Sequence, residues 1–225
     1  VNMNEKVLIV GAGTGLSASI ARLCSSEGME VALAARNIDK LVSLKKEINA
    51  KTFKCDASDI NEVSSLFREL DQSFGIPNLV IYNPSSRIRG AIGDLDPKET
   101  QEAINITCFG GFLVAQEASK RMLKNKKGSI FFTGASASIK GFANSSVFAM
   151  GKFGLRGLAQ SLARELHPQN IHIGHFIIDG GIGKSSTGYK LINPDSIANT
   201  YLEVHKQDSS AWTWEVELRT NKETF

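Results

Sequence analysis

A chain of 225 residues can bury one large hydrophobic core, and its 42% hydrophobic and 22% charged residues are typical of a globular protein. The net charge of +3 is small and dispersed, which argues against a nucleic-acid partner. No apolar run reaches the roughly 18 residues of a membrane span and no leader precedes the first strand pattern, so we expect a cytoplasmic protein without a membrane partner. The three cysteines are widely spaced and the four histidines lack metal-ligand spacing, so we expect neither a disulfide nor a metal site.

The first strand pattern ends in a glycine-rich turn. The apolar run 7–10 predicts a strand covered on both faces, and the sequence GAGTG follows it directly. Glycines allow positive φ and let a phosphate approach the backbone, while the free amides and the dipole at the start of the next helix attract an anion. The spacing G-x-G-x-G departs from the common dinucleotide fingerprint G-x-G-x-x-G. We nevertheless predict that the pyrophosphate of a dinucleotide binds at Gly11, Gly13, Thr14, Gly15 and Leu16.

Strand and helix patterns alternate along the rest of the chain. Further buried strands are predicted at 30–35, 52–55, 78–82, 129–133 and 171–178, and an edge strand at 211–218. Helical spacing predicts helices at 39–49, 59–74, 97–124, 143–166 and 194–205. Asp59 is placed to cap the second of these helices.

This alternation predicts an α/β fold. We expect one domain over residues 1–225, built on a doubly wound, Rossmann-type parallel sheet of about seven strands with helices on both faces. Ligands of such sheets bind at the carboxyl ends of the strands, where the strand order reverses. The glycine and serine content of 180–193 predicts a mobile loop over the substrate at that edge.

With these elements in order, the chain resembles the short-chain dehydrogenase/reductase family from about residue 6 to residue 205. The segment GAGTGLS at 11–17 is similar to that family's glycine turn, with Ser17 where its last glycine stands. Cys55-Asp56 resembles the aspartate after strand three, and FAMGKFGLRG at 148–157 resembles the segment of the family's Tyr-x-x-x-Lys motif. The resemblance implies an oxidoreductase that transfers hydride between a nicotinamide cofactor and a small carbonyl or alcohol substrate.

The resemblance also assigns roles to single residues. It implies that Asp56 holds the adenine amino group, that Lys152 holds ribose hydroxyls, and that Asn105 belongs to the active site. Asn83 and Gly180 stand in altered versions of the family turns that follow strands four and six, and we place both at the cofactor.

Two residues depart from the family where it carries its acid chemistry. Phe148 stands where the motif's tyrosine would be, four positions before Lys152, and Ala135 stands where a serine usually precedes that tyrosine. A phenylalanine cannot donate a proton, so cofactor binding is better retained than catalysis. The leading hypothesis is an NAD(P)-dependent oxidoreductase with an atypical proton donor. The alternative is a non-catalytic NADP(H)-binding sensor or scaffold.

A relocated hydroxyl is one way to restore the proton donor. The candidates in neighbouring segments are Ser136, Ser138, Tyr82 and Tyr189. We favour Ser136, acting through a water held by Lys152 and Asn105. For each serine taken alone, the competing interpretation is a polar loop residue that caps backbone groups.

The residue that follows the second strand bears on the choice of cofactor. An acidic residue there would accept hydrogen bonds from the ribose 2′-hydroxyl, whereas an arginine favours a 2′-phosphate. The strand is followed by Arg36, without an acid, so NADP(H) is predicted over NAD(H); the alternative is that Arg36 stacks on adenine.

Two further features concern partners. Arg87 and Arg89 flank the expected substrate side and would suit a carboxylate or phosphate, unless they are ordinary solvated side chains. Family members usually pair through the helices that correspond to 97–124 and 143–166, so the resemblance implies a homodimer or homotetramer.

Overall fold

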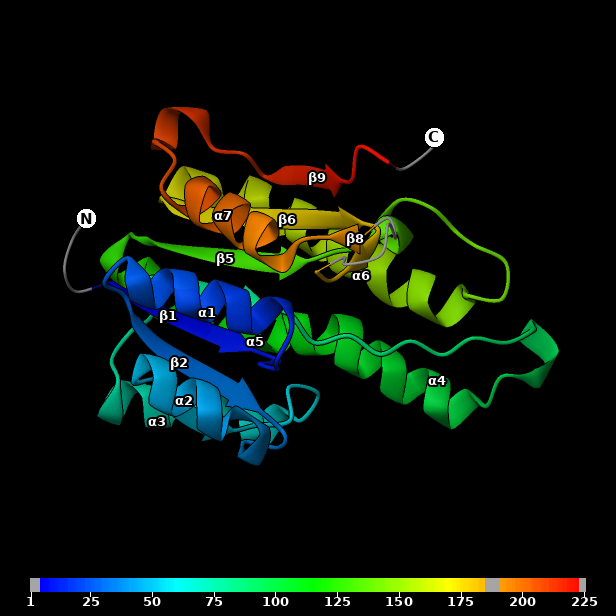
Figure 1. Cartoon of the computed structure of the whole chain (residues 1–225), viewed down its shortest axis with the longest axis horizontal. Coiled ribbons are helices and arrows are strands. Elements are labelled where there is room, and N and C mark those ends of the chain that lie inside the picture. The colour runs from blue at the N-terminus through cyan, green and yellow to red at the C-terminus, as the bar shows by residue number, and fades with distance from the viewer. Residues whose placement is uncertain (1–4, 185–190, 223–225) are drawn as a thin grey trace.

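The computed structural model describes residues 5–184 and 191–222, and its centre is a parallel sheet of seven strands (Figure 1). In chain order the strands are β1 (Lys6–Val10), β2 (Glu30–Ala35), β3 (Lys51–Lys54), β4 (Leu79–Tyr82), β5 (Gly128–Thr133), β6 (Ile171–Asp179) and β9 (Glu215–Arg219). Across the sheet they lie in the order β3-β2-β1-β4-β5-β6-β9, and every neighbouring pair is parallel. The predicted α/β fold with a Rossmann-type sheet is therefore confirmed. The edge strand expected at 211–218 is β9, which begins later, at Glu215.

Helices cover both faces of this sheet (Figure 1). One face packs against α1 (Leu16–Ser26), α2 (Val42–Ile48) and α7 (Pro194–His205). The other packs against α3 (Ile60–Ser73), α5 (Gly110–Asn125) and α6 (Ser146–Leu166). Successive strand residues point to opposite faces, so in β1 Val7 and Ile9 join the first core while Leu8 and Val10 join the second. Burial of each such side chain stabilises the fold by about 1.5–3 kcal/mol. The packed sheet therefore holds the strand ends that form the site in place.

The strand order reverses beside β1. The chain passes from β1 to β2 and β3 on one side, then returns to place β4 on the other side of β1. Val10 and Tyr82 are partners in the β1–β4 register, so the turns that begin at Gly11 and Asn83 leave the sheet next to each other. A crevice at this edge is where the ligand of a doubly wound sheet binds.

The helix expected at 97–124 is divided. It consists of α4 (Pro97–Ile104), a π-helical turn (Asn105–Phe109) and α5. At the end of the π turn the Gly110 amide donates to the Asn105 carbonyl, five residues earlier. Single π turns of this kind are frequent at functional sites, and no periodicity in the sequence marks them.

The starts of two other helices have local causes. Asp59 caps α3 as predicted, because its carboxylate accepts hydrogen bonds from the amides of Asn61 and Glu62. The helix expected at 143–166 begins only at Ser146, because Asn144 has a left-handed φ of 57° that a helix does not accommodate. In the part of the chain that the structure describes, no helix is both long and apolar enough to cross a lipid bilayer.

The segment 180–193 contains a small second sheet. Its two strands, β7 (Gly181–Ile182) and β8 (Leu191–Ile192), are parallel and pair with each other. The mobile loop predicted for this segment falls partly on residues 185–190, which lie outside the described residues.

Candidate active site

Two adjoining cavities lie at the carboxyl edge of the sheet. The larger, of about 680 Å³, is bounded by residues that follow β4, β5 and β6 and by the first turns of α6. The smaller, of about 390 Å³, is bounded by residues that follow β1, β2 and β3. Asn83 and Ser85 line both cavities. The two therefore form one elongated crevice across the point where the strand order reverses.

The glycine turn shapes the smaller cavity. Gly11 has a φ of 76°, and a Cβ on it would lie 2.7 Å from atoms of Pro84, so only glycine fits there without displacing the neighbouring turn. Gly13 and Gly15 differ, because a Cβ on either would meet no other atom within 4 Å. The start of α1 has no side-chain cap, and its N-cap is Gly15. An open turn at an uncapped helix start fits a pyrophosphate.

The five predicted pyrophosphate residues are placed differently within this turn. Gly11 lines the smaller cavity, while Gly13, Thr14, Gly15 and Leu16 continue the turn into α1 without lining either cavity. The Leu16 side chain is buried in the core, so only its backbone is available to a ligand.

Asn83 is fixed by a short chain of hydrogen bonds. Its side-chain amide donates to the Ser17 hydroxyl at 2.7 Å, and that hydroxyl donates to the Gly11 carbonyl at 3.2 Å. Its backbone amide donates to the Val10 carbonyl at 3.0 Å. Ser17, which stands in place of a family glycine, thus connects the turns after β1 and β4. Sequence reasoning did not assign it this role.

Three charged residues line the smaller cavity. Arg36 and Lys40 are exposed cations that follow β2, and Asp56 follows β3. Partial burial alone would raise the pKa of Asp56, but hydrogen bonds from Ser58 and the charge of Arg36 outweigh it and lower this pKa. Sequence reasoning missed Lys40; its position four residues after Arg36, in a short helical turn, is the signal that could have found it.

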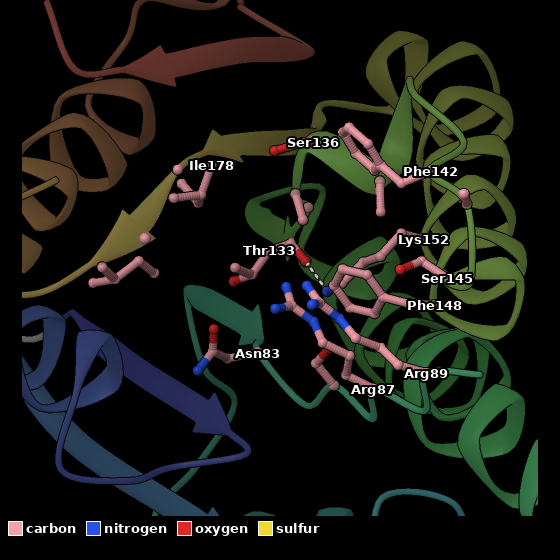
Figure 2. Close-up of a pocket in the computed structure, with 18 residues that line it drawn as sticks. Asn83, Arg87, Arg89, Thr133, Ser136, Phe142, Ser145, Phe148, Lys152 and Ile178 are labelled. Atoms are coloured by element: carbon pink, nitrogen blue, oxygen red, sulfur yellow. Dashed lines mark hydrogen bonds between the residues drawn. The ribbon is translucent and has the colours of Figure 1, made fainter. Parts of the chain in front are cut away.

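Lys152 lies in the larger cavity on α6. Its side chain is 2% exposed, and its Nζ donates a hydrogen bond of 2.7 Å to the Thr133 carbonyl at the end of β5 (Figure 2). Burial, with a smaller effect from the positive charge of Arg87, lowers the pKa of Lys152 to about 7. This amine can therefore gain or lose a proton near neutral pH.

Phe148 lies one helical turn before Lys152 and lines the same cavity. The guanidinium carbon of Arg87 lies 4.3 Å from the centre of its ring, and Lys152 Nζ lies 5.9 Å from that centre. Ala135 also lines the cavity. Phe148 and Ala135 therefore both line the larger cavity, and neither side chain carries a hydroxyl.

The candidate proton donors lie in different environments. Ser136 lines the larger cavity. Although burial would raise the pKa of Asp179, hydrogen bonding from the Ser136 hydroxyl and the charges of Lys140 and Arg219 lower it. The Ser136 hydroxyl therefore lies on the side of the cavity next to the Asp179 carboxylate.

The structure places two of the other candidates away from the cavity. Ser138 is fully buried, accepts a hydrogen bond from the Ala135 amide and lies 3.4 Å from His175. Tyr82 is also fully buried and donates to the Ile106 carbonyl. Tyr189 lies outside the described residues.

The remaining two predicted residues also differ in placement. Gly180 follows β6 and lines the larger cavity. Asn105 lines neither cavity, and its side-chain oxygen accepts a hydrogen bond of 3.0 Å from Gln101. The structure therefore brings Lys152, Ser136 and Gly180 together but leaves the Asn105 side chain engaged elsewhere.

A doubly wound parallel sheet, with a glycine turn after its first strand and a crevice across the switch point, defines a protein with a Rossmann-type fold. Residues 5–185 match the family model of the short chain dehydrogenases. The chain belongs to that family, as the resemblance implied. Members of this family are oxidoreductases that use NAD or NADP as cofactor.

Several named proteins are similar to the chain over most of its length. Sorbitol-6-phosphate 2-dehydrogenase of Escherichia coli (strain K12) is 28% identical over 218 residues, which cover 89% of this chain and 84% of that protein. An uncharacterized oxidoreductase of Staphylococcus aureus (strain USA300) is 27% identical and covers 96% of this chain and 98% of its own.

Solved structures agree with this assignment. A short-chain dehydrogenase from Rhodopseudomonas palustris is 32% identical, with a TM-score of 0.85 and coverage of 97% of this chain and 99% of that one. A metagenomic short-chain oxidoreductase solved in complex with NADP shares the fold, with a TM-score of 0.86 at 24% identity and coverage of 96% and 97%.

Proposed function

We propose that the protein is an NADP(H)-dependent oxidoreductase that interconverts a carbonyl compound and an alcohol, using an atypical proton donor. The observation that carries the proposal is the buried ammonium of Lys152 in one cavity of a crevice that extends to the glycine turn. Phe148 and Ala135 replace the two hydroxyl residues that the family uses at this cavity. The acid step must therefore use another group.

Support for cofactor binding comes from both cavities. The open glycine turn suits the pyrophosphate, Asp56 suits the adenine, and Lys152 suits the ribose hydroxyls near the larger cavity. Asn83 and Gly180 would line the path between them. NADP(H) is favoured over NAD(H) because Arg36 and Lys40 line the smaller cavity, where Asp56 is the single carboxylate among the described lining residues.

In the proposed reaction, bound NADPH supplies a hydride to the carbonyl carbon. The chain itself has to orient the carbonyl oxygen and deliver a proton to it. We propose Ser136 as the donor, through a water that Lys152 helps to hold; Asn105, which lines neither cavity, is left out of this step. The Ser136 hydroxyl lines the larger cavity and would pass its proton to that water, which protonates the substrate oxygen. Lys152 is suited to replace that proton because its pKa of about 7 allows exchange at neutral pH.

The second candidate function is a non-catalytic NADP(H)-binding sensor or scaffold. It is favoured by Phe148 and Ala135, because neither side chain carries a hydroxyl that could donate a proton. Cofactor binding is common to both functions, so only turnover separates them.

The test combines binding and turnover. NADPH is titrated by fluorescence, and oxidation of NADPH is then followed with aldehydes, ketones and quinones. Because the Escherichia coli relative is named for a phosphorylated polyol, phosphorylated sugars belong in the same screen. Turnover that falls at least tenfold in Ser136→Ala, but is unchanged in the exposed control Ser161→Ala, supports the enzyme with this donor.

Other outcomes decide against parts of the proposal. NADPH binding without turnover on any substrate favours the sensor. Turnover that Ser136→Ala leaves unchanged rejects Ser136 as the donor while keeping the oxidoreductase. A protein that binds neither NADPH nor NADH has neither function.

We further propose that the chain forms a homodimer or homotetramer through α5 and α6. Four large apolar side chains on the π turn and these helices are exposed: Phe109, Phe112, Met150 and Phe153. The two segments are packed together, since a Cβ on Gly151 or Gly154 would lie within 3 Å of Thr107 or Cys108. Exposed apolar groups at one such place are typical of a subunit interface.

A further inference from the structure

The larger cavity contains three cationic side chains and no carboxylate among the described residues that line it. Arg87 and Arg89 enter from the loop after β4, and Lys152 enters from α6. Figure 2 shows both guanidinium groups pointing toward Lys152 and the ring of Phe148. This is an unusual density of positive charge for a chain whose net charge is only +3.

Neither guanidinium has a hydrogen bond or an ion pair with the described residues of the chain. Other arginines of the protein are paired with carboxylates: Arg22 with Glu47, Arg121 with Asp71, and Arg156 with Glu215. The donors of Arg87 and Arg89 are therefore available, and they face a cavity rather than a flat surface.

The contact with Phe148 gives Arg87 a fixed place. A guanidinium whose face rests on an aromatic ring keeps the N–H groups of its edge free, which is the geometry that receives a carboxylate or phosphate. The ring itself is 7% exposed and anchored in α6. An arginine in this arrangement loses less freedom on binding an anion than a solvated side chain does.

The charges also favour an anion. Arg87 lies close enough to Lys152 that its charge contributes to the lowered pKa of that amine, and within the described lining no acid offsets the two. A negative group bound between them would relieve this repulsion. The phosphate site proposed at Arg36 and Lys40 belongs to the other cavity.

We propose that the substrate carries an oxyanion group, a carboxylate or a phosphate, and that Arg87 is the residue that selects it, assisted by Arg89. This inference rests on the proposed function, because it names the class of carbonyl substrate that the oxidoreductase takes. The oxyanion lies in the same cavity as Lys152, so the substrate is a small oxo acid or a short phosphorylated carbonyl compound.

The experiment measures anion binding by calorimetry, with the protein saturated with NADP⁺ so that its phosphate sites are filled. Oxalate and inorganic phosphate are the two oxyanion probes, and oxamide is the neutral match of oxalate. We expect one or both oxyanions to bind and oxamide not to bind. The probe that binds identifies carboxylate or phosphate as the preferred group.

Variants assign the binding to the arginines. Arg87→Gln is expected to lower the affinity for the preferred probe about tenfold or more. Arg87→Lys should lower this affinity less, because lysine keeps the charge but not the paired donors. Arg68→Gln, on the exposed side of α3 and bonded to Ser64 and Ser65, is the matched control and should change nothing. Dissociation constants for NADPH should agree within about twofold across all variants.

Several outcomes overturn the inference without touching the proposed function. They are no binding of either oxyanion, equal binding of oxamide, or binding that Arg87→Gln leaves unchanged. A loss of NADPH affinity in Arg87→Gln, with oxalate and phosphate unaffected, would instead assign the arginines to the cofactor. If NADP⁺ does not bind at all, the proposed function fails, and the same titrations on cofactor-free protein decide the inference.

Discussion

The ammonium of Lys152 donates a 2.7 Å hydrogen bond to the backbone carbonyl of Thr133, inside the protein and without a carboxylate partner among residues 5–184 and 191–222. Burial, followed by the charge of Arg87, holds the pKa of this residue at about 7 instead of 10.5. Below pH 7 the amine is charged in both the folded and the unfolded chain. The free energy of unfolding is then lowered by the full cost of burying this charge.

This pKa predicts how stability depends on pH. Between pH 7 and about 10.5 the folded chain has released the Lys152 proton and the unfolded chain has not, so stability increases with pH by up to about 1.4 kcal/mol per unit. Lys152→Met lacks this dependence. Its stability advantage over the natural chain should therefore shrink from pH 6.5 to pH 9.5 in urea unfolding without cofactor. An advantage that stays constant over this range contradicts the lowered pKa.

The glycine turn offers a pair of substitutions with separable effects. Gly11→Ala forces a Cβ against Pro84 at a positive φ and should lower the free energy of unfolding by about 1–3 kcal/mol. Gly13→Ala meets no protein atom and should leave stability unchanged, yet weaken NADPH binding because the methyl group enters the space proposed for the pyrophosphate. Thermal melting and fluorescence titration measure the two effects. Unchanged NADPH affinity in Gly13→Ala would place the pyrophosphate elsewhere.

The proposed preference for NADP(H) rests on Arg36 and Lys40. Replacing each with glutamine should weaken NADPH binding about tenfold and leave NADH binding nearly unchanged, because only NADPH carries the 2′-phosphate. The comparison uses dissociation constants for both cofactors, with Lys46→Gln on the exposed side of α2 as the control. A parallel loss for both cofactors would indicate that Arg36 stacks on adenine.

Restoring the family's acid tests whether the remaining geometry is productive. Phe148→Tyr places a hydroxyl in the larger cavity, on a ring 5.9 Å from Lys152, and should raise the rate of carbonyl reduction at least tenfold. Phe148→Leu changes the ring without adding a donor and should give no gain. Equal rates in the two variants would mean that the cavity no longer positions a substrate for this chemistry.

The proposed oligomer can be tested at one residue. Phe153→Glu places a charge on the exposed apolar face of α6 and should shift the protein toward the monomer in analytical ultracentrifugation. Val42→Glu on α2 is the matched control, since Val42 is 47% exposed and Phe153 is 44% exposed. If both variants sediment as the natural chain does, the interface does not include this face.

The sequence was sufficient for features that depend on neighbouring residues. The glycine turn, the strand periods and the Asp59 cap are local, and each is found in the structure where the pattern predicted it. The larger cavity could not be predicted in the same way, because the Arg87–Phe148 stack joins residues 61 positions apart and has no pattern of its own. The π turn at Asn105–Phe109, which divides the helix expected at 97–124, likewise has no periodicity in the sequence that marks it.

The hydrogen bonds from Asn83 to Ser17 and from Ser17 to Gly11 let the Ser17 side chain connect the two turns that meet in the crevice. A glycine at position 17, as the family usually has, would remove the acceptor of the Asn83 amide while leaving the amide in place. Ser17 thus ties the Asn83 side chain to the turn after β1, so a shift of either turn would be transmitted to the other.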